Sequence, residues 1–321
     1  MASAFFSRKK RNLFEKNFTP KKILLVRTDR IGDALISTPI FFTLRKLFPN
    51  AIITVLLSNK NKSSADLLPF VTNTMFLDKS IKSIYHTINK IRTEQFDVCI
   101  NLLLNRSTTA VLATQTSGAN YKIGFEEDPF LYDINIPKPE IIQNISITTQ
   151  SLLTPFTDEI QNQLFINVSN KNLPSLGKLN IGLNISAGSD ERKWSKIGWI
   201  SLAKLLKENN FQVSIICALK DKTIQEEIAN EANVNCAEIF SSLKQFVNLI
   251  NNFDIIITPD TSITHIASAL KKKIVLLMSN TNNHEIQWSP IGVEYRVINS
   301  ENGLLNIKSK EVFDKINELI N

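Results

Sequence analysis

The residues best suited to chemistry occur in three short segments, each of which follows an apolar, strand-like run. They are T-D-R-I-G-D at 28–33, S-A-G-S-D-E-R-K-W at 186–194 and T-P-D-T-S-I-T-H at 258–265. Each combines charged side chains with small or hydroxyl-bearing residues. Because ligands of open parallel sheets bind beyond the carboxyl ends of the strands, we expect these segments to form the functional site.

The first segment offers a carboxylate at a strand-to-helix turn. Gly32 would let the backbone approach a ligand closely, and Asp33 would project from the start of the following helix. Asp33 could act as a general base or cap the helix, and the residues leave both roles open. A helix N-terminus stabilises the ionised carboxylate and weakens it as a base. Burial and a neighbouring carboxylate such as Asp29 would have the opposite effect.

The second segment suits a phosphate. The loop that begins at Ser186 is followed by the cations of Arg192 and Lys193, so that backbone amides and positive charge could receive an anion together. The alternative is an ordinary solvated pair of cations, with Trp194 as a packing anchor.

The third segment predicts a diphosphate site at the start of a helix. The Thr261 hydroxyl, the free amides of Ser262 and Ile263 and the positive helix end can bind an anion without a metal. Asp260 would repel phosphate but could accept hydrogen bonds from sugar hydroxyls, or it could act as a cap. His265 is either an accessory residue of the site or a helix histidine satisfied internally.

The sequence motifs of several enzyme classes are absent. No G-x-G-x-x-G follows the first strand and no G-x-x-x-x-G-K-[ST] is present, which argues against a dinucleotide dehydrogenase and a P-loop kinase. The three histidines are dispersed and no D-x-D occurs, so we expect no dedicated metal site and no cofactor.

Composition indicates a folded protein of two domains. The chain has 321 residues, 43% of them hydrophobic and 21% charged, which excludes a disordered chain. No stretch approaches the ~20 apolar residues of a membrane span, and the first residues do not form a secretory signal, so we expect a cytoplasmic protein. We expect Cys99, Cys217 and Cys236 to be small buried hydrophobes.

Most of the formal charge of +7 lies in the first 22 residues, which contain seven basic residues and one acidic residue, Glu15. This basic and partly aromatic tail suits contact with an anionic membrane surface, or it is a solvated extension. Nothing downstream supplies a basic face or a recognition motif, so we do not expect nucleic-acid binding.

Apolar strand-like runs alternate with amphipathic stretches in two halves, which predicts parallel sheets covered by helices. Strands are expected at 22–28, 51–57, 74–79 and 96–104, then at 178–186, 211–219, 253–260 and 272–279. Helices are expected at 31–48, with a kink or break at Pro39, and at 80–94, 196–208, 221–231, 242–251, 262–270 and 310–320. The polar passage 155–178 is the linker candidate. We therefore predict an α/β fold of two Rossmann-like domains facing across a cleft, divided as 1–21 (basic extension), 22–165 and 166–321.

The three segments, in this order and at these junctions, resemble glycosyltransferase family 9, the heptosyltransferases of lipopolysaccharide core assembly. ILLVRTDRIGDALISTPIFFTLRKLFPNA is similar to the family's opening strand and helix, and the passage 96–125, ending in an I-G-F turn, resembles its next shared block. The resemblance runs from about Lys22 to Leu270.

The resemblance implies a role for individual residues. Asp33 takes the position of the family's catalytic base, with Arg30 and Gly32 as accessory positions. Arg192 stands where the family has a phosphate-contacting lysine, which keeps the charge but changes its geometry. Ser262 replaces a glycine, so that either its hydroxyl joins the diphosphate contact or donor binding is weakened. Asp221 takes the position of the ribose-binding acidic residue.

For the whole protein the resemblance implies a GT-B fold, with the acceptor bound by the N-terminal domain and a nucleotide-sugar donor by the C-terminal domain. The implied reaction is an inverting, metal-independent transfer, of heptose from ADP-heptose onto a lipid-linked oligosaccharide of the lipopolysaccharide core, at the inner face of the cytoplasmic membrane. The alternatives are a related transferase that uses another nucleotide sugar and a nucleotide-sugar-binding protein without catalysis.

Overall fold

The structure is a computed structural model that describes residues 18–78, 80–125, 130–140, 144–168, 177–279, 284–301 and 303–320. The chain divides into two compact units, unit 1 (Met1–Phe165) and unit 2 (Ile166–Asn321), between the same residues as the predicted domains. Residues 1–17 of the basic extension and 169–176 of the linker candidate lie outside the described residues. Within the described ranges, no helix is long and apolar enough to cross a membrane.

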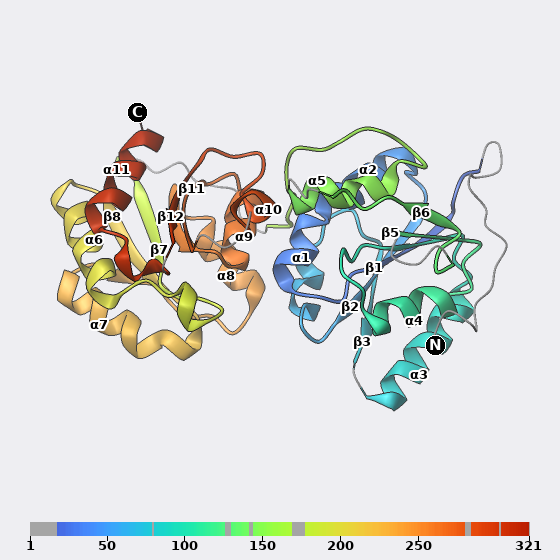
Figure 1. Ribbon diagram of the computed structural model, residues 1–321. Helices are drawn as coiled ribbons and strands as arrows, with labels where there is room; N and C mark the ends of the chain where they lie inside the picture. The colour runs from blue at the N-terminus through green and yellow to red at the C-terminus, as the bar shows by residue number, and fades with distance from the viewer. Residues whose placement is uncertain are drawn as a thin grey trace. The chain divides into compact units, whose positions relative to one another are not determined.

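Unit 1 is built on a six-stranded, all-parallel sheet in the order β3-β2-β1-β4-β5-β6, which is the order of a Rossmann fold (Figure 1). Its strands are β1 (Lys22–Val26), β2 (Ile52–Ser58), β3 (Asn73–Leu77), β4 (Val98–Asn101), β5 (Tyr121–Phe125) and β6 (Ile134–Ile136). Its helices are α1 (Ile31–Ile36), α2 (Thr38–Leu47), α3 (Ile81–Glu94), α4 (Thr108–Thr116) and α5 (Ile145–Gln150), with 3-10 turns η2 (Lys62–Leu67) and η3 (Ser151–Leu153).

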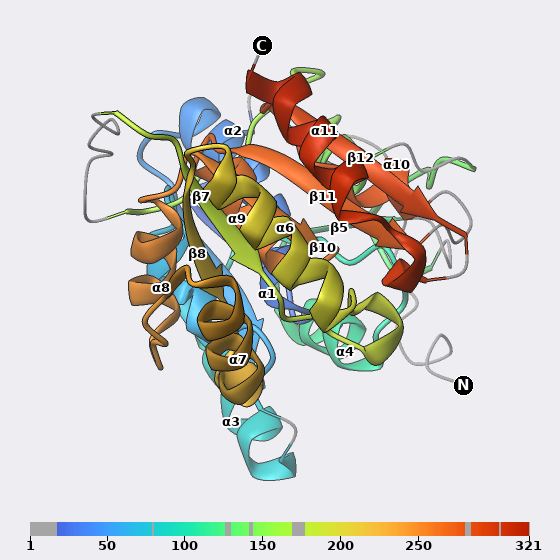
Figure 2. The ribbon, with the colours of Figure 1, turned by 90° about the vertical axis from the view of Figure 1, so that its left-hand side faces the viewer.

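Unit 2 repeats this topology, because its parallel sheet has the order β12-β11-β10-β7-β8-β9. Its strands are β7 (Asn180–Asn184), β8 (Gln212–Ile216), β9 (Asn235–Cys236), β10 (Ile255–Pro259), β11 (Lys273–Ser279) and β12 (Tyr295–Ser300). Its helices are α6 (Lys196–Glu208), α7 (Lys222–Ala232), α8 (Leu243–Ile250), α9 (Ser262–Ala269), α10 (His284–Trp288) and α11 (Ser309–Ile320), with 3-10 turns η4 (Asp190–Arg192), η5 (Leu219–Asp221) and η6 (Leu304–Asn306). Figure 2 shows α6, α7 and α11 over one face of this sheet.

Helices cover both faces of the sheet in unit 1, and this explains the continuous apolar runs. Leu24 and Val26 on β1 belong to the core beneath α3 and α4, whereas Ile23 and Leu25 point to the opposite face. All four side chains are fully buried. The predicted α/β class with two Rossmann-like domains is confirmed.

Proline breaks the helix that the sequence predicts over 31–48. The first helix ends at Ile36. Ser37 is both the C-cap of α1 and the N-cap of α2, which begins at Thr38 and has Pro39 in its first turn. Proline is compatible with the first turn of a helix because its missing N–H would have no partner there. The Ser37 hydroxyl donates to the Asp33 carbonyl oxygen at 2.9 Å and ties the two helices together.

Three other expectations are corrected. Ile123, Gly124 and Phe125 lie in strand β5 and not in a turn; a Cβ on Gly124 would come within 2.3 Å of the Tyr132 ring, so this glycine makes room for an aromatic side chain. Strand β4 ends at Asn101, before the predicted end at 104. Cys99 and Cys217 are buried as expected, but Cys236 is exposed, because β9 is an edge strand of only two residues.

Candidate functional site

The strand order of each unit reverses at one point, between β1 and β4 in unit 1 and between β7 and β10 in unit 2. Such a reversal sends the following loops to opposite faces and opens a crevice at the carboxyl ends of the strands. The first chemical segment follows β1, and the second and third follow β7 and β10. The tertiary structure thus brings the second and third segments together, although they are far apart in sequence.

In unit 1, Asp33 is the third residue of α1 and its side chain is buried (8% exposed). Its Oδ2 accepts a hydrogen bond from the backbone N–H of Arg30 at 2.9 Å, so the capping role is present in this structure. Arg30 itself is exposed, and Gly32 is a buried residue inside α1 and not part of the turn. The cap holds the carboxylate in place and leaves Oδ1 for another partner.

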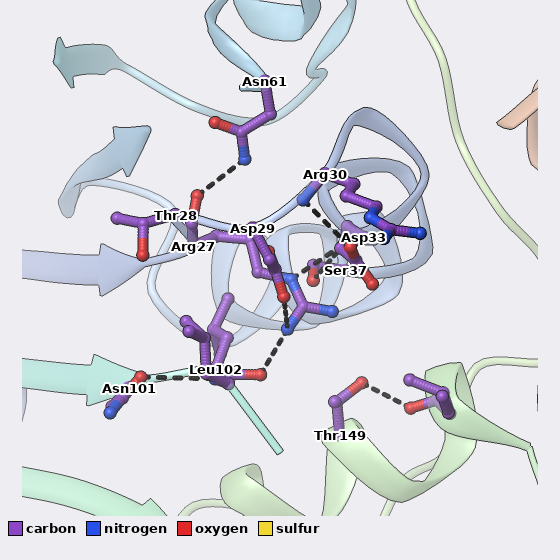
Figure 3. A network of polar contacts seen from close by, with 12 residues as sticks. Arg27, Thr28, Asp29, Arg30, Asp33, Ser37, Asn61, Asn101, Leu102 and Thr149 are labelled. Atoms are coloured by element: carbon purple, nitrogen blue, oxygen red, sulfur yellow. Dashed lines mark hydrogen bonds and ion pairs between the residues drawn. The ribbon is translucent and has the colours of Figure 1, made fainter. Parts of the chain in front are cut away.

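Arg27 lies beneath this turn and is a functional residue that the sequence motifs do not indicate. Its side chain is 1% exposed; Nε donates to the Asp33 carbonyl oxygen at 2.8 Å, and Nη1 donates to the Leu102 carbonyl oxygen at 2.5 Å (Figure 3). The guanidinium therefore ties the start of α1 to the end of β4. The signal that could have revealed it is a charged residue at the end of an apolar run, where burial requires fixed partners.

Asp29 is the second carboxylate of the same turn. Its Oδ2 lies 3.4 Å from Arg27 Nη1, and 30% of its side chain is exposed. Asp29 Oδ1 and Arg27 Nη2 are buried without a hydrogen-bond partner among the described residues. Burial raises the pKa of the Asp29 carboxyl to about 6; Arg27 opposes this rise, and the charge of Asp33 adds to it. The turn after β1 thus holds two carboxylates in different surroundings, one of them poised near neutral pH.

In unit 2, an ion pair joins the second and third segments. Arg192, at the end of η4, places Nη1 2.9 Å from Asp260 Oδ2 and 3.4 Å from the Asp260 carbonyl oxygen. The arginine side chain is 35% exposed and that of Asp260 only 12%. Because a guanidinium has several N–H groups in one plane, Arg192 can keep this contact and still donate to an anion.

A buried pair of polar residues holds the two segments at the reversal point. Asn184 at the end of β7 donates to Thr258 Oγ1 on β10 at 2.9 Å, and both side chains are fully buried. The Thr258 hydroxyl lies 3.3 Å from that of Thr261, which caps α9. Neither Asn184 nor Thr258 was singled out from the sequence, although both are polar residues at the ends of apolar strands.

The start of α9 differs in one respect from the expected pair of free amides. The backbone N–H of Ile263 donates to Thr261 Oγ1 at 3.3 Å, so this amide is already used within the cap. Ser262 is the first helical residue and is partly exposed. The serine therefore leaves the helix start intact, and the positive end of the helix remains beside Asp260.

Ser186 and Asp221 form a second polar link, between the ends of β7 and β8. The Ser186 hydroxyl donates to Asp221 Oδ2 at 2.6 Å and accepts the backbone N–H of Ala218 at 2.8 Å. Both side chains are buried. The hydroxyl of Ser186 is thus used to hold Asp221, and the predicted diphosphate contact of Ser186 would fall to its backbone.

The neighbours of Arg192 have different roles. Lys193 pairs with Asp190 in the preceding turn at 2.8 Å. Trp194 is a packing anchor, because it is buried, packs edge-on against Trp199 and donates from Nε1 to the Ile307 carbonyl oxygen at 3.0 Å. Of the two cations in this segment, Arg192 is the one that the structure joins to the third segment.

His265 is buried inside α9, with its ring centroid 6.0 Å from that of Trp288. This position fits the interpretation of a helix histidine, and the accessory role of His265 stays a prediction. In the described part of the chain, no three His, Cys, Asp or Glu side chains converge as a group that could hold a metal ion.

Comparison with known proteins agrees with this architecture. Residues 84–316 match the model of glycosyltransferase family 9 (heptosyltransferase). The lipopolysaccharide core heptosyltransferase OpsX of Haemophilus influenzae is 22% identical over 82% of this chain and 80% of its own length. A family 9 glycosyltransferase structure from Veillonella parvula has a TM-score of 0.81 at 16% identity and covers 94% of this chain and 97% of its own. The E. coli heptosyltransferase WaaC with ADP has a TM-score of 0.78 at 15% identity, over 92% and 99% of the two chains.

Two Rossmann-like units in tandem, with the polar segments at the reversal point of each sheet, define the GT-B fold, which these solved structures share. The chain belongs to glycosyltransferase family 9, the heptosyltransferase family, since the matched region spans more than half of its length.

Proposed function

We propose that this glycosyltransferase transfers heptose from ADP-heptose onto an acceptor of the lipopolysaccharide core. Two comparisons support this substrate class: OpsX is a lipopolysaccharide core heptosyltransferase, and WaaC has been solved both with ADP and with ADP-2-deoxy-2-fluoro heptose. The acceptor in this proposal is lipid-linked. Contact with an anionic membrane surface would involve the basic N-terminal residues, most of which lie outside the described part of the chain.

The observation that carries the proposal is the junction of Arg192, Asp260 and the N-terminus of α9 in unit 2. A cation and a positive helix end favour a diphosphate, and a carboxylate beside them suits the hydroxyls of the attached sugar. In this proposal Arg192, Lys193, Thr261 and Ser262 bind the diphosphate, and the Ile263 amide joins them by exchanging its 3.3 Å bond to Thr261 Oγ1 for one to the diphosphate. Asp260 binds the donor sugar, and the buried Asp221 faces the nucleotide ribose.

The proposed reaction is a single displacement with inversion. Asp33 removes the proton from an acceptor hydroxyl, whose oxygen attacks the anomeric carbon of the donor. The bond to the nucleotide breaks, and its electrons leave on the diphosphate, whose growing charge is stabilised by Arg192 and the start of α9. A positioned base contributes about 10²–10⁴-fold to such a step.

In this proposal the reaction uses no divalent metal ion and no cofactor, because cations and helix amides hold the diphosphate instead. Excess EDTA should therefore leave the rate of transfer unchanged. A loss of activity in EDTA that is restored by one added metal ion would contradict this part of the proposal.

Two alternatives follow from specific features. The pocket around the base and sugar of the donor is not fixed by the three segments, so another nucleotide sugar could replace ADP-heptose. Ser262, in place of the family's glycine, would suit a protein that binds a nucleotide sugar without transferring it.

The proposal is tested by offering the purified protein a panel of nucleotide sugars together with a core-oligosaccharide acceptor and identifying the product by mass spectrometry. Addition of one heptose from ADP-heptose, with inverted anomeric configuration, is the expected result. Transfer of another sugar would identify the related transferase, and donor binding without any product would identify the binding protein.

A further inference from the structure

The two carboxylates of the turn after β1 have very different partners. Asp33 Oδ2 accepts the Arg30 N–H at 2.9 Å in the first turn of α1, where the helix end stabilises negative charge. Asp29 has an ion pair of 3.4 Å with Arg27 and a buried Oδ1 without a hydrogen-bond partner among the described residues. A buried carboxylate oxygen without a donor makes the charged form of Asp29 costly, which favours its uptake of a proton.

The charges that face Asp29 come from three parts of unit 1. Arg27 from the end of β1 and Lys60 from the turn after β2 favour the ionised carboxylate, whereas burial and Asp33 on α1 favour the neutral carboxyl. The stabilisation by Arg27 is limited, because the same guanidinium also donates to the carbonyl oxygens of Asp33 and Leu102. The result is the raised pKa of about 6, which leaves Asp29 ionised above neutral pH and basic enough to accept a proton.

We propose that Asp29 and Asp33 act as one proton-accepting pair, so that the proton of the acceptor hydroxyl passes to the pair and not to Asp33 alone. This inference rests on the proposed transfer reaction and assigns it a second carboxylate. The hydroxyl O–H bond breaks and a carboxyl O–H bond forms. The freed electron pair of the oxygen forms the bond to the anomeric carbon, and the donor's C–O bond breaks with its electrons leaving on the diphosphate.

Asp29 could instead have a purely structural role as the counter-ion of the buried Arg27 (Figure 3). The two roles predict different results. Loss of a counter-ion would disturb the turn, lower stability and raise KM, but it would not move the pH at which the rate falls. Loss of a proton acceptor would lower kcat and move that pH, because coupled carboxylates titrate as a pair.

The experiment measures kcat and KM from about pH 4.5 to 8.5 for the wild type and for Asp29→Asn, Asp33→Asn and the double variant. Asp66→Asn is the matched control, because Asp66 is an exposed carboxylate of the same unit without a role in the turn. In the wild type we expect the rate to rise with pH through an apparent pKa near 6. Asp29→Asn should lower kcat by about 10–100-fold with KM little changed and move this rise away from pH 6. The control should match the wild type.

The other variants test whether the two carboxylates act together. Asp33→Asn removes the negative charge that raises the pKa of Asp29, so its residual activity should rise at a lower pH than that of the wild type. The double variant should lose less than the product of the two single losses, because residues that share one function are not additive.

An Asp29→Asn variant with wild-type kcat and an unmoved pH profile would overturn the inference. A raised KM and a lower melting temperature with an unmoved profile would also overturn it and identify Asp29 as the counter-ion of Arg27. Absence of transfer by the wild type with every nucleotide sugar would refute the proposed function itself, which keeps the two failures distinct.

Discussion

Replacement of Arg192 tests how unit 2 recognises a diphosphate. Arg192 is 35% exposed and already contacts Asp260 at 2.9 Å with one N–H group, which leaves other N–H groups of the fork for an anion. In Arg192→Gln the charged contact is lost. A hydrogen bond to a charged group contributes about 1.5–3 kcal/mol, and partial exposure places this one at the lower end, about 1.5–2 kcal/mol. The Kd for ADP should therefore rise by about 10–30-fold.

The same loss leaves the Asp260 carboxylate without the Arg192 contact beside the diphosphate. The double variant Arg192→Gln/Asp260→Asn should therefore bind ADP more tightly than Arg192→Gln alone, because a repulsive charge is removed. Arg192→Lys, which carries the cation implied by the family resemblance, should lose less affinity than glutamine. A single ammonium, however, serves both Asp260 and the phosphate less well than a planar fork.

Calorimetric titration with ADP and with adenosine measures these effects, since adenosine binding should not respond to Arg192. The matched control is Arg296→Gln. Arg296 also pairs with a carboxylate, Glu318 at 3.0 Å. It lies near the start of β12, at the amino ends of the parallel strands, whereas the candidate site lies at their carboxyl ends. If ADP binds Arg192→Gln within about twofold of the wild type, the diphosphate does not contact Arg192 and the reasoning fails.

Three further changes have defined outcomes. Asp33→Asn should lower turnover by about 10²–10⁴-fold in a transfer assay while calorimetry finds ADP affinity unchanged, and wild-type turnover would reject Asp33 as the base. Ser186→Ala removes the donor at 2.6 Å from the buried carboxylate of Asp221 and should lower the free energy of unfolding in urea by about 1–3 kcal/mol; an unchanged midpoint would mean that Asp221 finds another donor. Gly198→Ala places a Cβ within 2.5 Å of the Trp194 ring and should cost about 1–3 kcal/mol in the same measurement, whereas unaltered stability would show that the ring can move aside.

The parallel sheets were predictable because their strands are buried on both faces and read as continuous apolar runs. The runs at 22–28, 211–219 and 253–260 each contain an observed strand, the run at 51–57 matches β2 to within one residue at each end, and the break near Pro39 separates two observed helices. The short strands β6 and β9, strand β5 and the edge strand β12 were not recognised from their sequences. The first two have only three and two residues, too few for a pattern to emerge.

The chemical segments were predictable to the level of residue type and place. A carboxylate after β1, a cation after β7 and a hydroxyl at the start of α9 all follow from strand-to-helix junctions that the sequence marks clearly. What each side chain contacts was not predictable. The sequence predicts a phosphate contact for Arg192 but not its ion pair with Asp260. It places Ser186 in the anion-binding loop but does not predict that the Ser186 hydroxyl donates to Asp221.

By itself, the sequence determined the α/β class, the two halves and the three segments, because hydrophobic period and helix-start chemistry are local properties of the chain. Tertiary structure alone decided that Arg192 meets a carboxylate 68 residues away and that a buried Arg27 supports the turn of Asp33. It also decided that Asp29 titrates near pH 6, since the pKa depends on how much water packing removes and on which charges it brings close. Contacts between distant residues and the loss of solvent arise only when parallel strands pair in one register and helices cover them.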